Sequence, residues 1–227
     1  QAGLLIDRAW GWEPCTVAAI KGSRPKSSSL SSGQVLPEPY PHEKARLIVR
    51  EMADQLSLEL VEKGLVCSQF VLDIGYDAEN LSAPVRQKTY HGPTKTDRYG
   101  RAVPAAAHGS VNLPVPASSA RILMQAAAEV FDRIADSRLS VRRVTVTAAG
   151  LLRQEEAQLV GGDQLDFFGN YAAHQQQKAE LERELSGQQA IVALRQKYGK
   201  NAVLRGMDLQ EGATTKNRNG QIGGHKA

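Results

Sequence analysis

The chain has 227 residues, enough for one large domain or for a smaller domain with extensions. Lys and Arg outnumber Asp and Glu by 28 to 24, and the net charge of +4 permits a polyanionic partner without requiring one. A hydrophobic content of 41% excludes wholesale disorder, and an aromatic content of 5% argues against a base-stacking platform with many rings. No apolar run has the roughly 20 residues of a membrane helix, and we expect a cytoplasmic protein without a membrane partner.

The sequence contains no recognisable catalytic or metal-binding motif. The two cysteines, Cys15 and Cys67, lie far apart and outside any Cys/His cluster, so we expect reduced structural thiols and no zinc site. The histidines lack metal-ligand spacing, and the chain has neither a phosphate-binding Gly-rich loop nor a nucleophile elbow. We therefore expect no catalytic residue, metal or cofactor in this chain.

The first elements in chain order are a helical remnant, a linker and a strand. Residues 1–21 hold a short apolar piece that looks like the end of a helical unit, and the chain begins at Gln1, which predicts that the rest lies upstream. Residues 22–28 are a Gly/Ser/Pro-rich basic linker. A strand is predicted over 29–36, ended by Pro37, Pro39 and Pro41 because proline cannot donate to a ladder.

Two amphipathic helices and three further strands follow. Residues 42–63 place Ala45, Ile48 and Met52 on one helical face and Glu51 on the other, and Gly64 is a good C-terminal stop. Strict alternation at 70–76 predicts a half-buried strand, and 110–115 and 141–151 predict two more. A second helix is predicted over 120–134, and 78–107 is predicted to be a long basic loop.

The order is β-α-β-β-α-β, which predicts an α+β fold: a four-stranded antiparallel sheet with both helices on one face. The other face must be solvated or occupied by a partner. Arg143, Thr145 and Thr147 point to it from the last strand, opposite serines of the first strand. Hydroxyls and strand amides can bind phosphate oxygens without reading bases, so this face suits a nucleic-acid backbone.

The chain beyond residue 151 is more polar. We expect a linker over 152–170, a helix over 171–198 and a flexible tail over 199–227. Two adjacent phenylalanines in the linker have two interpretations: they pack back on the domain, or they fill the apolar pocket of a partner as a short linear motif. The motif comprises Gln164, Leu165, Asp166, Phe167 and Phe168.

Together, KSSSLSSGQVL at 26–36 and VRRVTVTAAGL at 141–151 resemble the little-finger domain of Y-family translesion DNA polymerases, in the UmuC/DinB-like ImpB/MucB/SamB branch. Residues 1–21 are similar to the end of the thumb, 22–28 to the thumb–little-finger linker and 29–151 to the little finger. The resemblance implies palm carboxylates that bind two Mg²⁺ ions, but the sequence has no Asp-Glu pair. It thus implies that nucleotidyl transfer belongs to an upstream palm, with fingers and thumb as intramolecular partners.

By this resemblance, the chain is the DNA-gripping part of an error-prone polymerase acting in DNA repair and the SOS response. It implies contacts with the phosphate backbone of damaged primer-template DNA. The residues that it implicates are Lys26, Ser27, Ser29, Ser31, Arg142, Arg143, Thr145 and Thr147, with Arg86 and Lys88 added from the long basic loop.

QLDFF at 164–168 is similar to the motif by which bacterial polymerases of this kind bind the sliding clamp, although here some sixty residues follow it. The leading hypothesis is therefore a DNA-binding and clamp-tethering region without chemistry of its own. The alternative is a stand-alone ferredoxin-like nucleic-acid or protein interaction module; an inactive remnant is a third possibility. RNA readers of this topology expose strand aromatics, whereas Phe70 and Tyr76 share the buried register.

Overall fold

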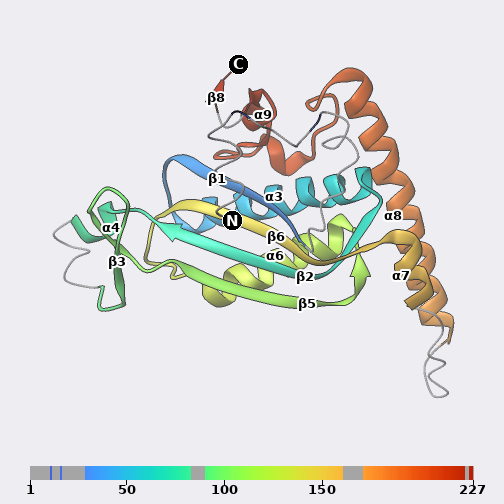
Figure 1. The fold of residues 1–227 in the computed structure, drawn as a ribbon, viewed down its shortest axis with the longest axis horizontal. Helices are drawn as coiled ribbons and strands as arrows, with labels where there is room; N and C mark the ends of the chain where they lie inside the picture. Colours follow the sequence, from blue (N-terminus) through green and yellow to red (C-terminus); the bar gives the residue numbers. More distant parts are fainter. Residues whose placement is uncertain are drawn as a thin grey trace.

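A four-stranded antiparallel sheet with two long helices forms the centre of the computed structural model (Figure 1). The structure describes residues 29–82, 90–160 and 171–222, together with residues 11, 16, 225 and 226. The strand order is β1-β6-β2-β5, which confirms the predicted α+β fold. The elements are β1 (Ser29–Tyr40), α3 (His42–Glu62), β2 (Leu65–Tyr76), β5 (Ala107–Ala117), α6 (Ala120–Ile134) and β6 (Val141–Arg153).

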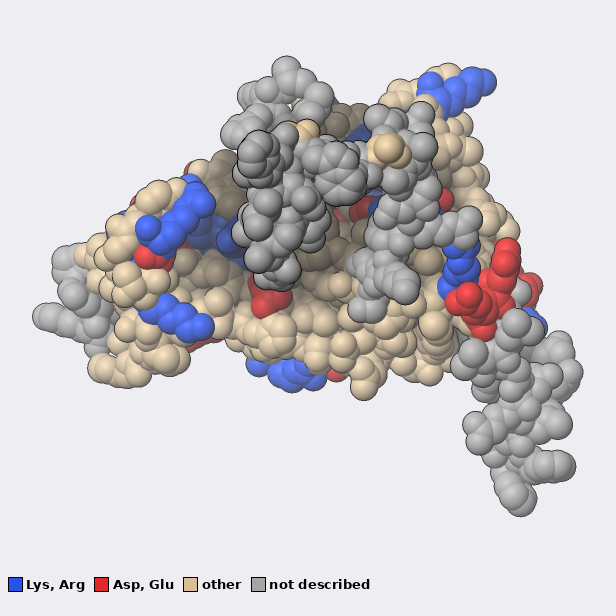
Figure 2. Space-filling view, viewed as in Figure 1, with Lys and Arg blue, Asp and Glu red and all other residues tan. Residues whose placement is uncertain are grey.

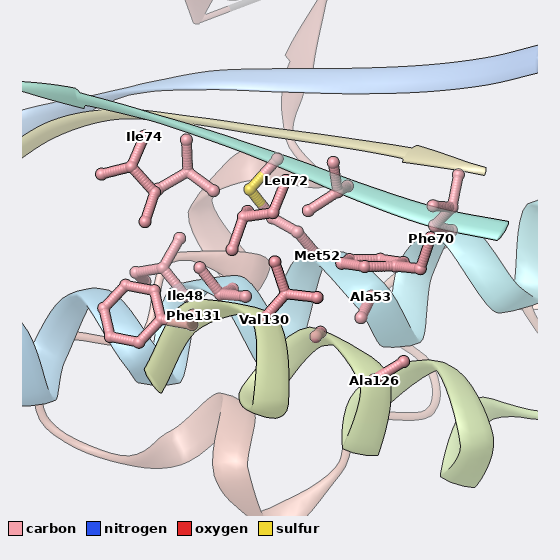
Figure 3. Packing of buried hydrophobic residues seen from close by; sticks show 14 of the residues in the cluster. Ile48, Met52, Ala53, Phe70, Leu72, Ile74, Ala126, Val130 and Phe131 are labelled. Atoms are coloured by element: carbon pink, nitrogen blue, oxygen red, sulfur yellow. The ribbon is translucent and has the colours of Figure 1, made fainter. Parts of the chain in front are cut away.

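The core lies between one face of this sheet and the two helices (Figure 3). Phe70, Leu72 and Ile74 alternate inward along β2 and are fully buried, as the period of two predicts. They meet Ile48 of α3 and Phe131 of α6. Burial of one such side chain stabilises the fold by about 1.5–3 kcal/mol, so this alternation fixes which face of the sheet remains outside the core.

Both helices begin and end close to their predicted limits. Gly64 follows α3 with a φ of +63°, a backbone conformation that glycine adopts without a Cβ penalty. Ser119 caps α6, and its side-chain oxygen accepts a hydrogen bond from the amide of Ile122 at 3.2 Å. The amphipathic periods, with Gly64 as the stop of the first helix, were sufficient to predict the two helices from the sequence.

The two edge strands each contain an irregular Pro-x-Pro stretch. In β1, the pairing with β6 shifts register between Val35 and Tyr40, where Pro37 and Pro39 lie. In β5, the pairing with β2 shifts register at residues 114–116, opposite Cys67 and Gln69. The prediction that the prolines end the first strand at residue 36 is therefore wrong, because an edge strand can leave their nitrogens unpaired and continue. Such irregularities also discourage edge-to-edge pairing with other chains.

The predicted long loop at 78–107 has structure of its own in its described part. It contains α4 (Glu79–Ser82), β3 (Thr94–Thr96) and β4 (Ala102–Pro104), and the last two pair as an antiparallel ribbon. Asp97 holds the turn of this ribbon, since its carboxylate accepts from the amides of Tyr99 and Arg101. Figure 1 places α4 and β3 at the end of the sheet opposite to α8.

The helices α7 (Gln154–Val160) and α8 (Tyr171–Tyr198) follow the sheet. The first part of the predicted linker over 152–170 has regular structure, because β6 continues to Arg153 and α7 extends to Val160. Gly187 does not interrupt α8. Gln188 is buried, and its amide donates to Ser57 Oγ at 3.2 Å and to the Ser118 carbonyl at 3.1 Å. These contacts attach α8 to the helical layer.

The final residues also pack on the domain. We call residues 199–222 the C-terminal segment; it includes η1 (Gly206–Leu209), α9 (Thr215–Arg218) and β7 (Gln221–Ile222), and β7 pairs with β8 (His225–Lys226). Arg205 Nε lies 2.5 Å from Asp54 Oδ1, and the Thr214 amide donates to Glu51 Oε2 at 3.0 Å. The C-terminal segment thus packs on α3, whereas a flexible tail was predicted. Glu51, predicted on the helical face opposite the core, is buried because this segment supplies donors to the α3 carboxylates.

No helix within the described ranges is long and apolar enough to cross a membrane.

Candidate nucleic-acid interface

The sheet face opposite the two long helices is lined by polar side chains at regular register positions. Gly109 of β5 approaches Ile134 and Val130 of α6, so its neighbours in β5 point to this opposite face. We call it the open face. Its residues are Ser29, Ser31, Gly33 and Val35 of β1; Arg143, Thr145, Thr147 and Ala149 of β6; Gln69, Val71, Asp73 and Gly75 of β2; and His108, Ser110 and Asn112 of β5.

The register arranges these residues in rows across the strands. One row runs Ser31, Thr147, Val71, Ser110 and the next runs Gly33, Thr145, Asp73, His108. Ser31 Oγ and Thr147 Oγ1 share a hydrogen bond of 2.8 Å, as the predicted juxtaposition of serines and threonines requires. Each of these hydroxyls has further hydrogen-bonding capacity, so the row can also engage an external acceptor.

Arg143 is the only arginine or lysine among the open-face positions. It pairs with Val35 of β1 and with Gly75 of β2. A Cβ at Gly75 would lie 3.1 Å from the Arg143 Cβ, so the missing side chain leaves room for the arginine stem. Val35, on the other side, is 60% exposed. The guanidinium is thus flanked by small or apolar groups and no carboxylate is its register partner.

Arg142 lies elsewhere, because it is the extra residue of a β-bulge. Gly75 and Tyr76 of β2 pair with Arg143 and Val141, which leaves Arg142 between them without a partner in the ladder. Its Nε lies 3.6 Å from Asp77 Oδ2, at a surface hollow beside α4 and β4. Arg142 and Arg143, two adjacent arginines that were both predicted to contact the phosphate backbone, therefore lie at different places on the surface.

Asp73 and His108 are two open-face residues that the sequence analysis did not select. His108 Nδ1 lies 2.6 Å from Asp73 Oδ1, and the two side chains are 65% and 47% exposed. The alternation of β2 already predicts Asp73 as an outward residue. His108 gave no such signal, because the third strand was predicted to begin at residue 110, whereas β5 begins at Ala107.

Gln69 and Asn112 lie in a third row with Ser29 and Ala149, and the Gln69 amide donates to Asn112 Oδ1 at 3.1 Å. No open-face position of the four strands holds Phe, Tyr or Trp, and Phe70 and Tyr76 are buried as expected. With His108 as its one ring, the open face offers hydrogen bonds and charge but no stacking platform for successive bases.

Further cations lie on the β3–β4 ribbon. Figure 2 shows Lys and Arg side chains gathered at the end of the molecule where Figure 1 places α4 and β3. Arg101 pairs with Asp97 at 2.8 Å, and Arg98 lies over the Tyr99 ring at 4.7 Å. The ribbon therefore adds exposed guanidinium groups beyond one end of the sheet.

Several predicted contact residues lie outside the described residues. They are Lys26, Ser27, Arg86, Lys88 and the whole motif Gln164, Leu165, Asp166, Phe167 and Phe168. The described positions are Ser29, Ser31, Thr145, Thr147 and Arg143, all on the open face, and Arg142 in the bulge.

The described residues show no catalytic arrangement. They contain no group of three or more His, Cys, Asp or Glu side chains that could hold a metal ion. Cys67 is free, and burial raises the pKa of its thiol to about 12, so it is a structural thiol and a poor nucleophile.

Comparison with protein families agrees with this geometry. Residues 27–163, more than half of the chain, match the impB/mucB/samB family C-terminal domain. The chain belongs to this family. A search of curated proteins gave no match. The matched region spans the complete four-stranded sheet and both of its helices, and it identifies the C-terminal part of a Y-family polymerase of the DNA damage response. A polymerase of this family acts on DNA.

Proposed function

We propose that this chain is the DNA-binding region of an error-prone translesion polymerase and that its open face grips the phosphate backbone of primer-template DNA. The observation that carries the proposal is the open face itself: hydroxyl rows with an arginine, on a family domain whose parent enzyme acts on DNA. Hydroxyl, amide and guanidinium donors bind phosphates irrespective of sequence. A polymerase that copies damaged templates needs this kind of contact, because the bases it meets are altered.

The role of the chain is positioning. Contacts on β1 and β6 hold the duplex, while chemistry belongs to an upstream palm domain with carboxylates and Mg²⁺. The strand amides of edge strand β1 and the Ser31–Thr147 hydroxyl pair supply neutral donors, and Arg143 supplies charge. The alternative of a stand-alone RNA-reading module has less support, because no Phe, Tyr or Trp occupies the open face of the described strands.

A salt titration tests this backbone contact. The affinity of the 227-residue chain for primer-template DNA should fall about tenfold or more between about 50 mM and about 200 mM salt, because bound cations release condensed counterions. Two duplexes of unrelated sequence should bind equally. An affinity that does not change with salt, or a strong preference for one sequence, would contradict the proposal.

Arg143→Gln locates the contact on the sheet. This change should weaken DNA binding about fivefold and reduce the slope of the salt dependence by about one. Arg183→Gln on α8 is the matched control, because this exposed arginine lies outside the sheet, and it should bind as the unchanged chain does. Equal affinities for both variants would place the DNA elsewhere on the molecule.

We also propose that Gln164–Phe168 binds a bacterial sliding clamp. The support is the sequence similarity of QLDFF to clamp-binding motifs, with Leu and Phe side chains suited to an apolar pocket. A clamp tether raises the local concentration of the polymerase at the primer end, so moderate DNA affinity suffices. Replacing Phe167 and Phe168 by alanine should abolish clamp binding and leave DNA binding unchanged; clamp binding that survives this change would rule the motif out.

A further inference from the structure

The open face carries one carboxylate, Asp73, beside its rows of hydroxyl groups. Asp73 of β2 lies in the row of Thr145 and Gly33, and its neighbour in β5 is His108. An unpaired carboxylate there would repel a nucleic-acid backbone. The 2.6 Å contact between His108 Nδ1 and Asp73 Oδ1 is thus the feature that decides whether this part of the face accepts a phosphate.

The contact assigns the protons of the imidazole. An ionised carboxylate can only accept, so at this distance Nδ1 of His108 carries the shared proton. The remaining nitrogen, Nε2, then has two states. In the neutral ring, Nε2 bears a lone pair that repels a phosphate oxygen. In the protonated ring, Nε2 is an N–H donor and the ring carries a positive charge. The His108 side chain is 65% exposed, so Nε2 is accessible to a ligand.

Among the residues that the structure describes, few charged groups face this pair. On the paired open-face positions they are Arg143, Asp73 and His108; Thr145, Gly33 and Ser110 beside them are uncharged. From α6, Arg133 donates to the Ser110 carbonyl at 2.6 Å and lies 4.0 Å from Glu129. The formal charge of the open face therefore changes from zero to +1 when His108 gains a proton, because Arg143 and Asp73 cancel.

We propose that Asp73 and His108 form a proton-dependent phosphate contact, in which His108 takes up a proton at Nε2 as the DNA backbone binds. This inference rests on the proposed DNA contact of the open face and adds a specific site to it on β2 and β5. The ligand class is the phosphodiester group. Asp73 orients the imidazole through Nδ1, and the phosphate accepts from Nε2.

Measurements of DNA affinity at two pH values test the pair. The 227-residue chain should bind primer-template DNA about fivefold more tightly at about pH 6 than at about pH 8, at constant ionic strength. His108→Gln should lose this dependence and bind at both pH values as weakly as the unchanged chain binds at the higher one. Circular dichroism at both pH values confirms that each variant is folded.

Asp73→Asn gives a second result that a merely structural pair would not produce. Removal of the carboxylate raises the charge of the face by one, so DNA binding at about pH 8 should become about threefold tighter than that of the unchanged chain. His91→Gln is the control, because His91 is an exposed histidine ahead of β3 and outside the four sheet strands; it should keep the full pH dependence.

The outcomes separate the two proposals. Salt-sensitive DNA binding that does not change with pH overturns the role of His108 and leaves the backbone contact intact. The role of His108 is equally overturned if His108→Gln keeps the pH dependence or if Asp73→Asn does not bind more tightly. Absence of DNA binding at both pH values overturns the open-face contact and, with it, the proton-dependent site.

Discussion

The open face and the surface of α3 beneath the C-terminal segment are both polar, yet they are built in opposite ways. On the open face, Asp73 and His108 remain about half exposed and pair with each other across two strands. Beneath the C-terminal segment, the Asp54 side chain is 3% exposed and Glu51 is 1% exposed. The first surface leaves hydrogen-bonding capacity for a partner, whereas the second is completed by the chain itself.

The energetics of the covered surface explain why the C-terminal segment must be specific. Burial raises the pKa of Glu51 and of Asp54, because removal of water disfavours the charged carboxylates. The amides of Thr214 and Thr215 oppose this rise at Glu51, and Arg205 opposes it at Asp54. A segment without these donors would leave two buried charges unpaired. Only a segment with hydrogen-bond donors at these positions can therefore cover this part of α3.

The largest expected effect follows from breaking the Arg205–Asp54 pair. Arg205→Met leaves the buried Asp54 carboxylate without its 2.5 Å partner, and removal of one member of a buried pair is strongly destabilising. Arg205 is 38% exposed and Arg195 also lowers the pKa of Asp54, so the loss is about 2 kcal/mol in the free energy of unfolding. Urea denaturation measures it.

Arg183→Met on α8 is the control for this change, because it removes an exposed arginine of the same C-terminal half. It should alter the free energy of unfolding by less than about 0.5 kcal/mol. If both variants unfold alike, the C-terminal segment does not depend on its buried ion pair, and the contrast with the open face loses its main support.

A smaller loss is expected at the contact between α8 and the helical layer. Gln188→Ala removes the donor of the Ser118 carbonyl and of Ser57 Oγ, two acceptors that the side chain reaches inside the protein. Because both acceptors are neutral, we expect a loss of about 1 kcal/mol, the low end of the cost of an unsatisfied buried acceptor, which thermal unfolding would show as a lowered Tm. Gln189→Ala changes the exposed neighbour and should leave the Tm unchanged. Equal Tm values for the two variants would contradict a structural role of Gln188.

The regular part of the fold was predictable because each element carries its own signal. The helices over 42–62 and 120–134 follow from apolar periods with an end signal, and the outward side chains of β6 follow from strict alternation. Alternation also predicted that Thr145 and Thr147 share a face with Arg143. These features depend on residues close together in the chain, which is why one sequence suffices to find them.

The remaining features depend on residues that are distant in the chain. Glu51 looks solvated on a helical wheel, and its partners Thr214 and Thr215 lie more than 160 residues later. The Asp73–His108 pair depends on the register of β2 against β5, which a Pro-x-Pro irregularity shifts. A period of two or 3.6 residues contains no information on either pairing. The bulge at Arg142 is likewise invisible until β6 is aligned with its neighbours.

The smallest expected effect is a difference in how stability depends on pH at two carboxylates, the buried Glu51 and the ion-paired Asp132. Burial raises the pKa of Glu51, so the folded protein takes up this proton at a higher pH than the unfolded chain, where the Glu pKa is about 4.3. The stabilisation that protonation of Glu51 gives to the folded protein is complete below the Glu51 pKa of the unfolded chain, and it is lost as pH rises through the Glu51 pKa of the folded protein. Asp132 on α6 is the opposite case, because hydrogen bonds from Arg46 lower its pKa.

These signs predict opposite trends when unfolding is measured between about pH 7 and about pH 2, a range that extends below the ordinary Asp pKa of about 3.9 so that Asp132 also becomes protonated. Acidification should raise the stability of the unchanged chain relative to Glu51→Gln, since protonation relieves the buried charge that the variant never has. Acidification should lower its stability relative to Asp132→Asn, since the ion pair with Arg46 is lost as the carboxylate is protonated. If the free energies of unfolding of Glu51→Gln and of the unchanged chain change with pH in parallel, water reaches Glu51. The surface of α3 beneath the C-terminal segment would then be as accessible to solvent as the open face.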